Sequence, residues 1–153
     1  ILLAATNHEH LLDTAVWRRF SYKVELTLPE EQSRVRLFDM FLKKYNMANE
    51  KKYLLAKLSE RVSGADIRHI CEDAIRAAIL SDSASTDIAT MLREIIQIRL
   101  NRQIDFAKKS DSDFQDVLAL APKAITQKML AELFYSHSST ISRRLHKKGE
   151  TDG

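Results

Sequence analysis

Residues 63–80 read SGADIRHICEDAIRAAIL and carry the clearest helical pattern of the chain. Apolar side chains recur there at steps of three and four, which is the period of a helix that buries one face. They are Ile67, Ile70, Cys71, Ala74, Ile75, Ala78 and Ile79. Ser63 and Asp66 stand at the start of the run, where either side chain can cap a free amide of the first turn. We therefore predict a long amphipathic helix that begins just after Ser63.

Three further helical patterns surround this run, two before it and one after it. Their apolar positions are Leu37, Phe38, Phe41, Leu42 and Tyr45, then Leu54, Leu55, Leu58 and Val62, and finally Ile88, Met91, Leu92, Ile95 and Ile96. Four amphipathic helices with short connections can close a bundle around one core. The sequence therefore predicts a four-helix bundle over residues 30–104.

The pattern before Pro29 has a different period. Residues 1–5 are continuously apolar, as in a strand covered on both faces of a parallel sheet, and residues 22–28 alternate apolar and polar positions. A short helix is expected between them, over 11–19. Two strands do not make a stable sheet alone, so we expect their partners before Ile1 and the chain to be a fragment. The predicted fold is mainly α, with the last strands of a truncated parallel α/β sheet over 1–29.

Composition narrows the class of protein. The chain has 153 residues, of which 44% are hydrophobic and 29% charged, so it is an ordinary globular sequence rather than a disordered tail. One cysteine, Cys71, excludes a disulfide framework and a structural zinc site, and it suits a reducing, cytoplasmic location. No apolar run approaches the roughly 20 residues that span a bilayer, so we expect no membrane segment.

Four short motifs occur in a characteristic order and at characteristic distances. They are Ala4-Ala5-Thr6-Asn7, Leu12-Asp13-Thr14-Ala15-Val16-Trp17-Arg18-Arg19-Phe20, Leu28-Pro29 and Ser63-Gly64-Ala65-Asp66-Ile67. Together they resemble the second half of an AAA+ ATPase module, over about residues 1–100. The resemblance implies the end of the α/β core over 1–29, a helical lid over 30–104, and a function in an oligomeric ring, a hexamer in many such proteins.

The resemblance also implies roles for individual residues. Asn7 matches the sensor 1 position that places the water attacking the γ-phosphate of ATP, and Arg18 and Arg19 match the paired fingers presented to a neighbouring subunit. Gly64 and Ala65 match the turn that lies against the adenine and ribose. The residues alone allow simpler interpretations: a turn asparagine for Asn7, surface arginines packed over Trp17 and Phe20, and a helix cap at Ser63.

The parts that bind phosphate and metal are missing from this sequence. Three glycines, Gly64, Gly149 and Gly153, do not form a G-x-x-x-x-G-K-[ST] loop, and no strand ending in paired acidic residues precedes Asn7. The ligands of ATP phosphates and Mg²⁺ are therefore expected upstream, and the segment alone is predicted to be inactive. His8 and His10 lack a third ligand, so no metal site is predicted.

The last third of the chain has a pattern of its own. Residues 105–113 form a polar linker candidate, and 114–149 resemble a bacterial helix-turn-helix with Ala131, Leu133 and Ile141 at core positions. The polar side chains expected to face DNA are Ser139, Thr140, Ser142, Arg143 and Arg144. Residues 126–149 hold five basic residues against one acidic residue, which suits phosphate contact.

Two alternatives stay open for this C-terminal element. The helix pair can finish the bundle or bind another protein instead of DNA, because Tyr135 occupies the turn position that usually holds glycine. Conversely, the whole chain can be a non-enzymatic DNA-binding module in which the bundle only supports the helix-turn-helix.

Overall fold

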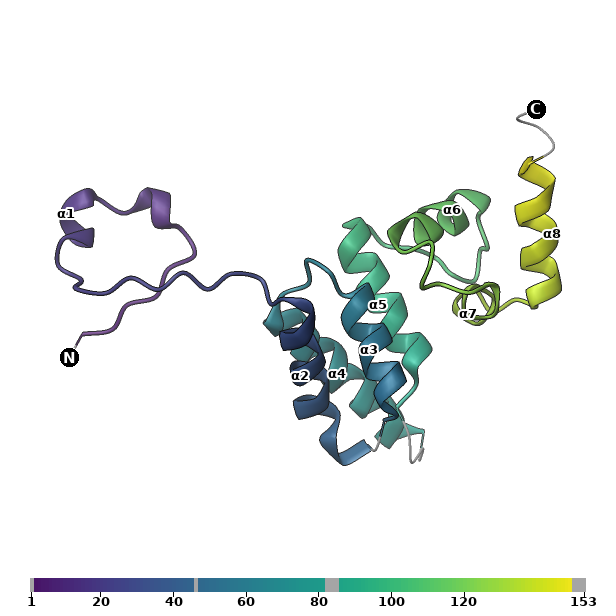
Figure 1. Ribbon diagram of the computed structural model, residues 1–153, viewed down its shortest axis with the longest axis horizontal. Coiled ribbons are helices and arrows are strands. Elements are labelled where there is room, and N and C mark those ends of the chain that lie inside the picture. Colours follow the sequence, from purple (N-terminus) through teal and green to yellow (C-terminus); the bar gives the residue numbers. More distant parts are fainter. Residues whose placement is uncertain (1, 46, 82–85, 150–153) are drawn as a thin grey trace.

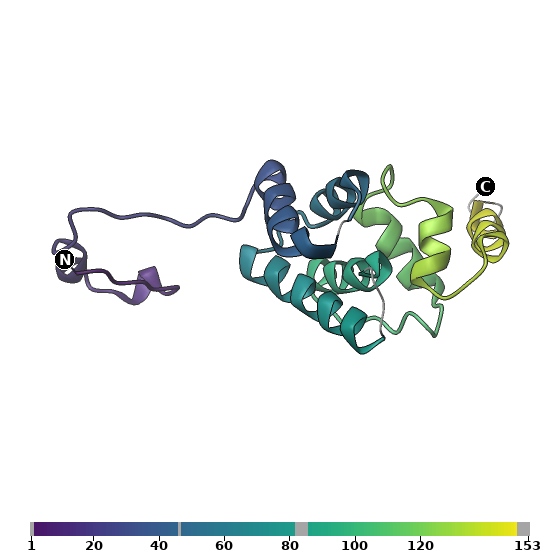
Figure 2. The same cartoon turned by 90° about the horizontal axis from the view of Figure 1, so that it is seen from below.

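A computed structural model describes residues 2–45, 47–81 and 86–149 of the chain. In this part of the chain all regular structure is helical and no strand is formed. Figure 1 shows a group of packed helices at the end of a long N-terminal segment that stands away from them, and the perpendicular view in Figure 2 agrees. The prediction of a mainly helical fold is confirmed.

Four helices form the predicted bundle. They are α2 (Glu31–Leu42), α3 (Asn49–Leu58), α4 (Gly64–Leu80) and α5 (Ile88–Leu100), with a short 3-10 turn, η2 (Lys43–Tyr45), after α2. α2 packs against α3 and α4, and α5 packs against the same two helices from the other side. Each helix turns its apolar stripe inward, so the side chains meet in one core.

The stripe on α4 illustrates how the pattern is used. Ile67, Ile70, Cys71, Ala74 and Ala78 are buried, as their spacing predicts. Ile79 is 66% exposed, because it lies near the last turn of α4, at the edge of the stripe. The periodic pattern therefore predicts the buried face well in the middle of the helix and less well at its end.

Three more helices complete the described part of the chain at the far end of α5. They are α6 (Asp111–Leu120), α7 (Gln127–Leu133) and α8 (Ser138–Gly149); α5 packs against α6 and α7, and α7 packs against α8. The ring of Phe134 lies 4.3 Å from that of Phe114 and 5.1 Å from that of Phe106, centre to centre. These aromatic residues belong to the same hydrophobic core as the bundle.

The segment 105–113 differs from the polar linker expected there. Phe106 is buried in the core and α6 already begins at Asp111. The ring of Phe106 contacts the ring of Phe134 and the guanidinium of Arg93, and these contacts favour its burial over exposure to water. Its burial holds the segment between α5 and α6 against the helices. A linker prediction based on polar composition does not reveal that one aromatic side chain of the segment is buried.

The N-terminal segment contains only two short helical turns, η1 (Glu9–Leu11) and α1 (Thr14–Trp17). The strands predicted at 1–5 and 22–28 are not formed in the described residues, and residue 1 lies outside them. A strand exists through backbone hydrogen bonds to a neighbouring strand, and no such neighbour is present among these residues. The apolar side chains of the two segments stay in contact with water: Leu3 is 90%, Tyr22 90% and Leu26 92% exposed.

Candidate functional site

The N-terminus of α4 is closed by reciprocal hydrogen bonds. The backbone N–H of Asp66 donates to Ser63 Oγ at 3.1 Å, and the backbone N–H of Ser63 donates to Asp66 Oδ2 at 3.3 Å. The Ser63 hydroxyl also donates to the same carboxylate oxygen at 2.6 Å. This capping box fixes the direction of the first helical turn. The helix cap predicted for Ser63 or Asp66 is thus confirmed, with both residues taking part.

Gly64 and Ala65 follow the cap and form the first turn. Their backbone N–H groups have no acceptor among the described residues, as is usual for the first amides of a helix. A Cβ atom at Gly64 would lie 3.7 Å from Leu37 Cδ1, an ordinary contact, so packing alone does not demand glycine here. A glycine with free amides at a helix start allows a ligand to approach the backbone closely.

Arg34 connects the N-terminal segment to the bundle close to this turn. Its guanidinium is buried, with Nε donating to the carbonyl of Ala56 and Nη1 donating to the carbonyl of Pro29, both at 2.8 Å. The segment therefore leaves the bundle in a direction set by α2 and α3. Sequence reasoning missed Arg34, although it stands on the apolar stripe of α2, three and four residues before Leu37 and Phe38.

Asn7, Arg18 and Arg19 lie on the N-terminal segment, and the structure does not bring them to the N-terminus of α4 (Figures 1 and 2). All three are exposed. The Arg18 and Arg19 side chains make no ion pair or hydrogen bond with the described residues. The ring of Trp17 is covered by Lys23, whose Nζ lies 4.6 Å from its centre.

The residues predicted to face DNA divide into two groups on α8. Ser139 and Arg143 are exposed, whereas Thr140 and Ser142 are half-buried. Arg144 is bound within the protein: its Nη1 donates to the carbonyl of Lys109 and pairs with Asp111 at 3.2 Å. Its guanidinium also lies 5.3 Å from the ring centre of Phe114.

The turn between α7 and α8 has the strain expected of its sequence. Tyr135 adopts a left-handed conformation with φ of 48°. The N–H of Ser136 donates to the carbonyl of Ala131 at 2.8 Å, and the N–H of Tyr135 points to the carbonyl of Glu132 at 3.4 Å. This is the bond pattern of a Schellman ending, in which glycine is the usual left-handed residue.

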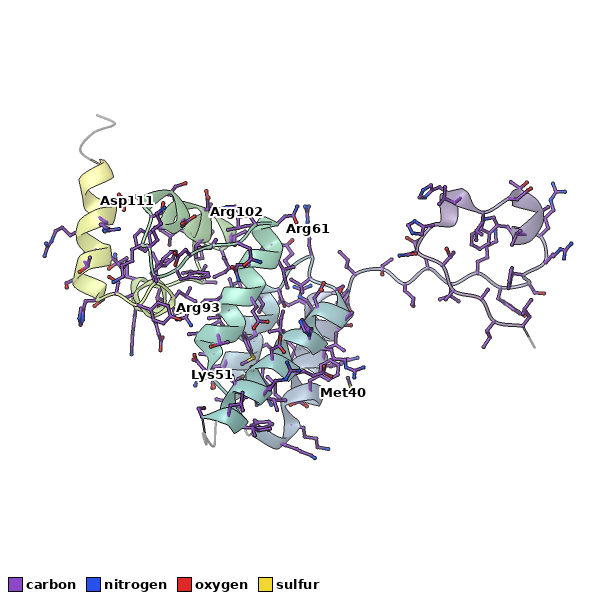
Figure 3. All side chains as sticks on the ribbon, turned by 180° about the vertical axis from the view of Figure 1, so that it is seen from behind. Met40, Lys51, Arg61, Arg93, Arg102 and Asp111 are labelled. Atoms are coloured by element: carbon purple, nitrogen blue, oxygen red, sulfur yellow. The ribbon has the colours of Figure 1, made fainter. Side chains whose placement is uncertain are left out.

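Arg93 on α5 stabilises that turn from outside (Figure 3). Its Nε donates to the carbonyl of Leu133 and its Nη2 to the carbonyl of Glu132, both at 2.9 Å. The guanidinium lies 4.2 Å from the ring centre of Tyr135, so the ring that strains the turn also gains a cation–π contact. No local pattern predicts this role, because Arg93 is about 40 residues away from its acceptors.

The acidic, cysteine and histidine side chains were the candidates for a metal site. The described residues include no group of three or more His, Cys, Asp and Glu side chains arranged to hold a metal ion. The rings of His8 and His10 meet edge to face with centres 6.1 Å apart. Within the described ranges, none of the helices combines the length and the apolar character that crossing a bilayer requires.

Known proteins resemble this chain in sequence. A proteasome-activating nucleotidase of Saccharolobus islandicus is 35% identical over 104 residues, which are 66% of this chain and 26% of that protein. Its counterpart in Methanopyrus kandleri is 39% identical over 93 residues, or 59% and 21%. A spastin of Ixodes scapularis is 28% identical over 134 residues, or 76% and 21%. No family model matches, and no solved structure gave a significant match.

These relatives are AAA+ ATPases. The matched sequence supports the interpretation of this chain as a C-terminal segment of an AAA+ ATPase. It spans about a quarter of the length of the nucleotidase that it matches.

Proposed function

We propose that this chain is the C-terminal portion of an AAA+ ATPase that couples ATP binding and hydrolysis in an oligomeric ring, such as a hexamer, to the remodelling of a client. The bundle α2–α5, with its capped glycine turn at the start of α4, is the observation that carries this proposal. The names of two of the relatives refer to activation of a proteasome, which favours a protein client over a nucleic acid.

Within the whole protein, the bundle would act as the lid over the nucleotide. The free amides of Gly64 and Ala65 would face the adenine and ribose, and Arg34 would hold the connection on which the lid turns relative to the core. This role is supported by the rigid capping of α4 beside a position where packing does not require glycine.

The N-terminal segment would complete the α/β core. Its exposed apolar side chains, such as Leu3 and Leu26, need a sheet to cover them. In that sheet Asn7 would orient the attacking water, and Arg18 and Arg19 would reach the γ-phosphate bound by the next subunit. The free guanidinium groups fit this role, since a finger must be available to bind phosphate oxygens.

The described residues do not fit a magnesium site, because no suitable group of side chains is present among them. The sequence also holds no phosphate-binding loop. We therefore assign neither magnesium ligands nor the phosphate-binding loop to this chain, and the 153-residue chain alone should give no ATP turnover above a mock-purified control.

The arginine fingers provide the decisive test. In the full-length protein, Arg18→Ala or Arg19→Ala should lower turnover by about 10³–10⁵ while nucleotide binding is retained, because a finger acts on the neighbour's phosphate. Lys23→Ala is the matched control, since it removes one positive charge from the same segment. Mixing a finger variant with subunits lacking a functional phosphate loop should restore some activity. Wild-type turnover of both arginine variants would refute the assignment and the ring with it.

DNA binding by residues 126–149 is the second candidate. It is favoured by the tight turn that joins the consecutive helices α7 and α8 and by the exposure of Ser139 and Arg143. The names of the three relatives reported above do not refer to DNA. Arg143→Ala should weaken duplex binding and reduce its salt slope by about one unit, whereas Lys123→Ala should not. Duplex binding is measured by fluorescence anisotropy at several salt concentrations. If its salt dependence is the same for both variants, α7 and α8 form a helical hairpin that only packs on the bundle.

A further inference from the structure

A groove runs along the outer face of the bundle between α2 and the start of α3. Its volume is about 500 Å3. Val35, Arg36, Asp39, Met40 and Lys43 line it from the α2 side, and Asn49, Lys52 and Tyr53 line it from the α3 side. This volume is in the range that holds a few side chains of a ligand or peptide. None of these residues has a role in the nucleotide or DNA assignments above.

Two large side chains in the groove are unusually exposed. Met40 is 58% and Tyr53 59% accessible, and Figure 3 shows Met40 on the outer side of the bundle. Methionine adapts its shape to different partners, and tyrosine contributes contact area at little conformational cost. Both residue types are enriched in protein–protein contacts. The groove therefore offers apolar anchoring positions.

The charges around these anchors are unbalanced. Asp39 is bound to Lys52 at 2.6 Å, and this hydrogen bond, helped by the charges of Lys52 and Lys43, lowers the pKa of the Asp39 carboxyl. Lys52 is therefore already paired. Arg36 and Lys43 are exposed, and neither makes an ion pair or a hydrogen bond with the described residues. The groove is left with two cations that can pair with a ligand.

We propose that the α2–α3 groove docks a short acidic segment of a partner protein, in which one large apolar side chain is flanked by carboxylates. The apolar side chain would pack between Met40 and Tyr53, and the carboxylates would pair with Arg36 and Lys43. A nucleic acid fits less well, because it carries no aliphatic or aromatic side chain to pack between Met40 and Tyr53. The proposal stands apart from ATP hydrolysis, since the groove shares no residue with the nucleotide-facing turn.

The test uses the 153-residue chain and a defined probe. The probe is a short fluorescein-labelled peptide with a Leu-Phe pair flanked by Asp and Glu on both sides. Two control peptides carry Lys in place of the acidic residues, or Ser in place of the Leu-Phe pair. We expect a saturable rise in anisotropy with the acidic peptide that weakens as salt is added, and at least roughly tenfold weaker binding of both controls.

Variants of the protein locate the binding site. Arg36→Glu combined with Lys43→Glu should weaken peptide binding about tenfold at low salt, because two attractions become repulsions. Lys108→Glu combined with Lys123→Glu changes the net charge equally at exposed positions elsewhere and should leave binding unchanged. Met40→Ala should weaken binding about threefold or more, whereas Leu80→Ala, at another exposed apolar position, should not.

Several results would overturn the proposal. Equal loss in both charge-reversed pairs would show a nonspecific attraction, and no saturable binding of the acidic peptide would show that the groove does not take it. The Arg36→Glu and Lys43→Glu changes are compared for two probes, single-stranded DNA and the acidic peptide. If they weaken DNA binding more than peptide binding, the groove is a nucleic-acid surface. The chain itself could also associate in sedimentation experiments. If only the Arg36→Glu, Lys43→Glu variant loses this association, the occupant of the groove is a second copy of the chain.

Discussion

At the residue scale, two arginines join parts of the protein that are distant in sequence. Arg34 binds carbonyls of Pro29 and Ala56, and Arg93 binds carbonyls of Glu132 and Leu133. In both cases a planar cation with several donors bridges two backbone carbonyl oxygens. Each contact fixes the position of a neighbouring segment: the N-terminal connection in the first case and the α7–α8 turn in the second.

Cys71 gives a prediction at the same scale. Its side chain is fully buried, and burial, together with Glu72 and Glu94, raises the pKa of its thiol from 9.0 to about 12. Because the unfolded chain ionises first, this thiol favours the folded state below about pH 9, and that contribution falls as the pH rises toward 12. The native protein should therefore react with Ellman's reagent at pH 8 far more slowly than the urea-unfolded protein. Similar rates in both states would contradict the burial of Cys71.

At the scale of single elements, helix ends decide how the chain turns. α4 begins with a complete capping box, whereas Ser110 before α6 makes no side-chain cap hydrogen bond. α7 ends with Tyr135 in a left-handed conformation, and the cation of Arg93 lies over its ring. The same residue type, serine, thus caps one helix start and not another. Ser110 also has an aspartate three residues on, but Asp113 pairs with Arg102 at 2.7 Å.

This contrast can be measured directly. Ser63→Ala should lower the free energy of unfolding by about 1 kcal/mol, because the amide of Asp66 loses its acceptor. Ser110→Ala should change it by less than about 0.5 kcal/mol, as expected for a serine without a cap bond. Urea unfolding followed by far-UV circular dichroism gives both values. A larger effect at Ser110 than at Ser63 would mean that the first turn of α4 is not held by its cap.

At the scale of the whole molecule, α2–α5 and α6–α8 share one hydrophobic core, and the N-terminal segment lies outside it. Phe134 ties the C-terminal helices to that core through Phe106 and Phe114. The C-terminal helices are thus expected to move with the bundle as one body rather than as a separate domain.

A single cooperative transition should follow from this shared core. Far-UV circular dichroism should report one unfolding step for all helices between residues 31 and 149, and Phe134→Leu should shift that step by about 1 kcal/mol or more without splitting it. Fluorescence of Trp17 should not follow the same curve, because the residue lies on the separate N-terminal segment. Two helical transitions, or a tryptophan signal that coincides with the helical one, would contradict this picture.

The helices of the bundle and the face that each one buries were predictable from the sequence. Periodic apolar residues such as Ile67, Ile70 and Ala74 predict their own burial, because a helix repeats every few residues and the pattern is local. The cap at Ser63 was predictable for the same reason. The family resemblance was readable from short motifs, and the similar nucleotidases and spastin confirm it.

Contacts between residues far apart in the chain follow from the way the helices pack and from no local pattern. Arg93 lies about 40 residues from the carbonyls that it binds, and Arg144, which is predicted to face DNA, also pairs with the distant Asp111. Phe106 was placed in a linker by the polar residues around it, yet it packs against Phe134 in the core. A propensity or a period describes neighbours along the chain, whereas these positions depend on which surfaces the folded helices bring together. The strands expected at 1–5 and 22–28 show the same limit, because a strand forms only where another strand supplies its hydrogen bonds.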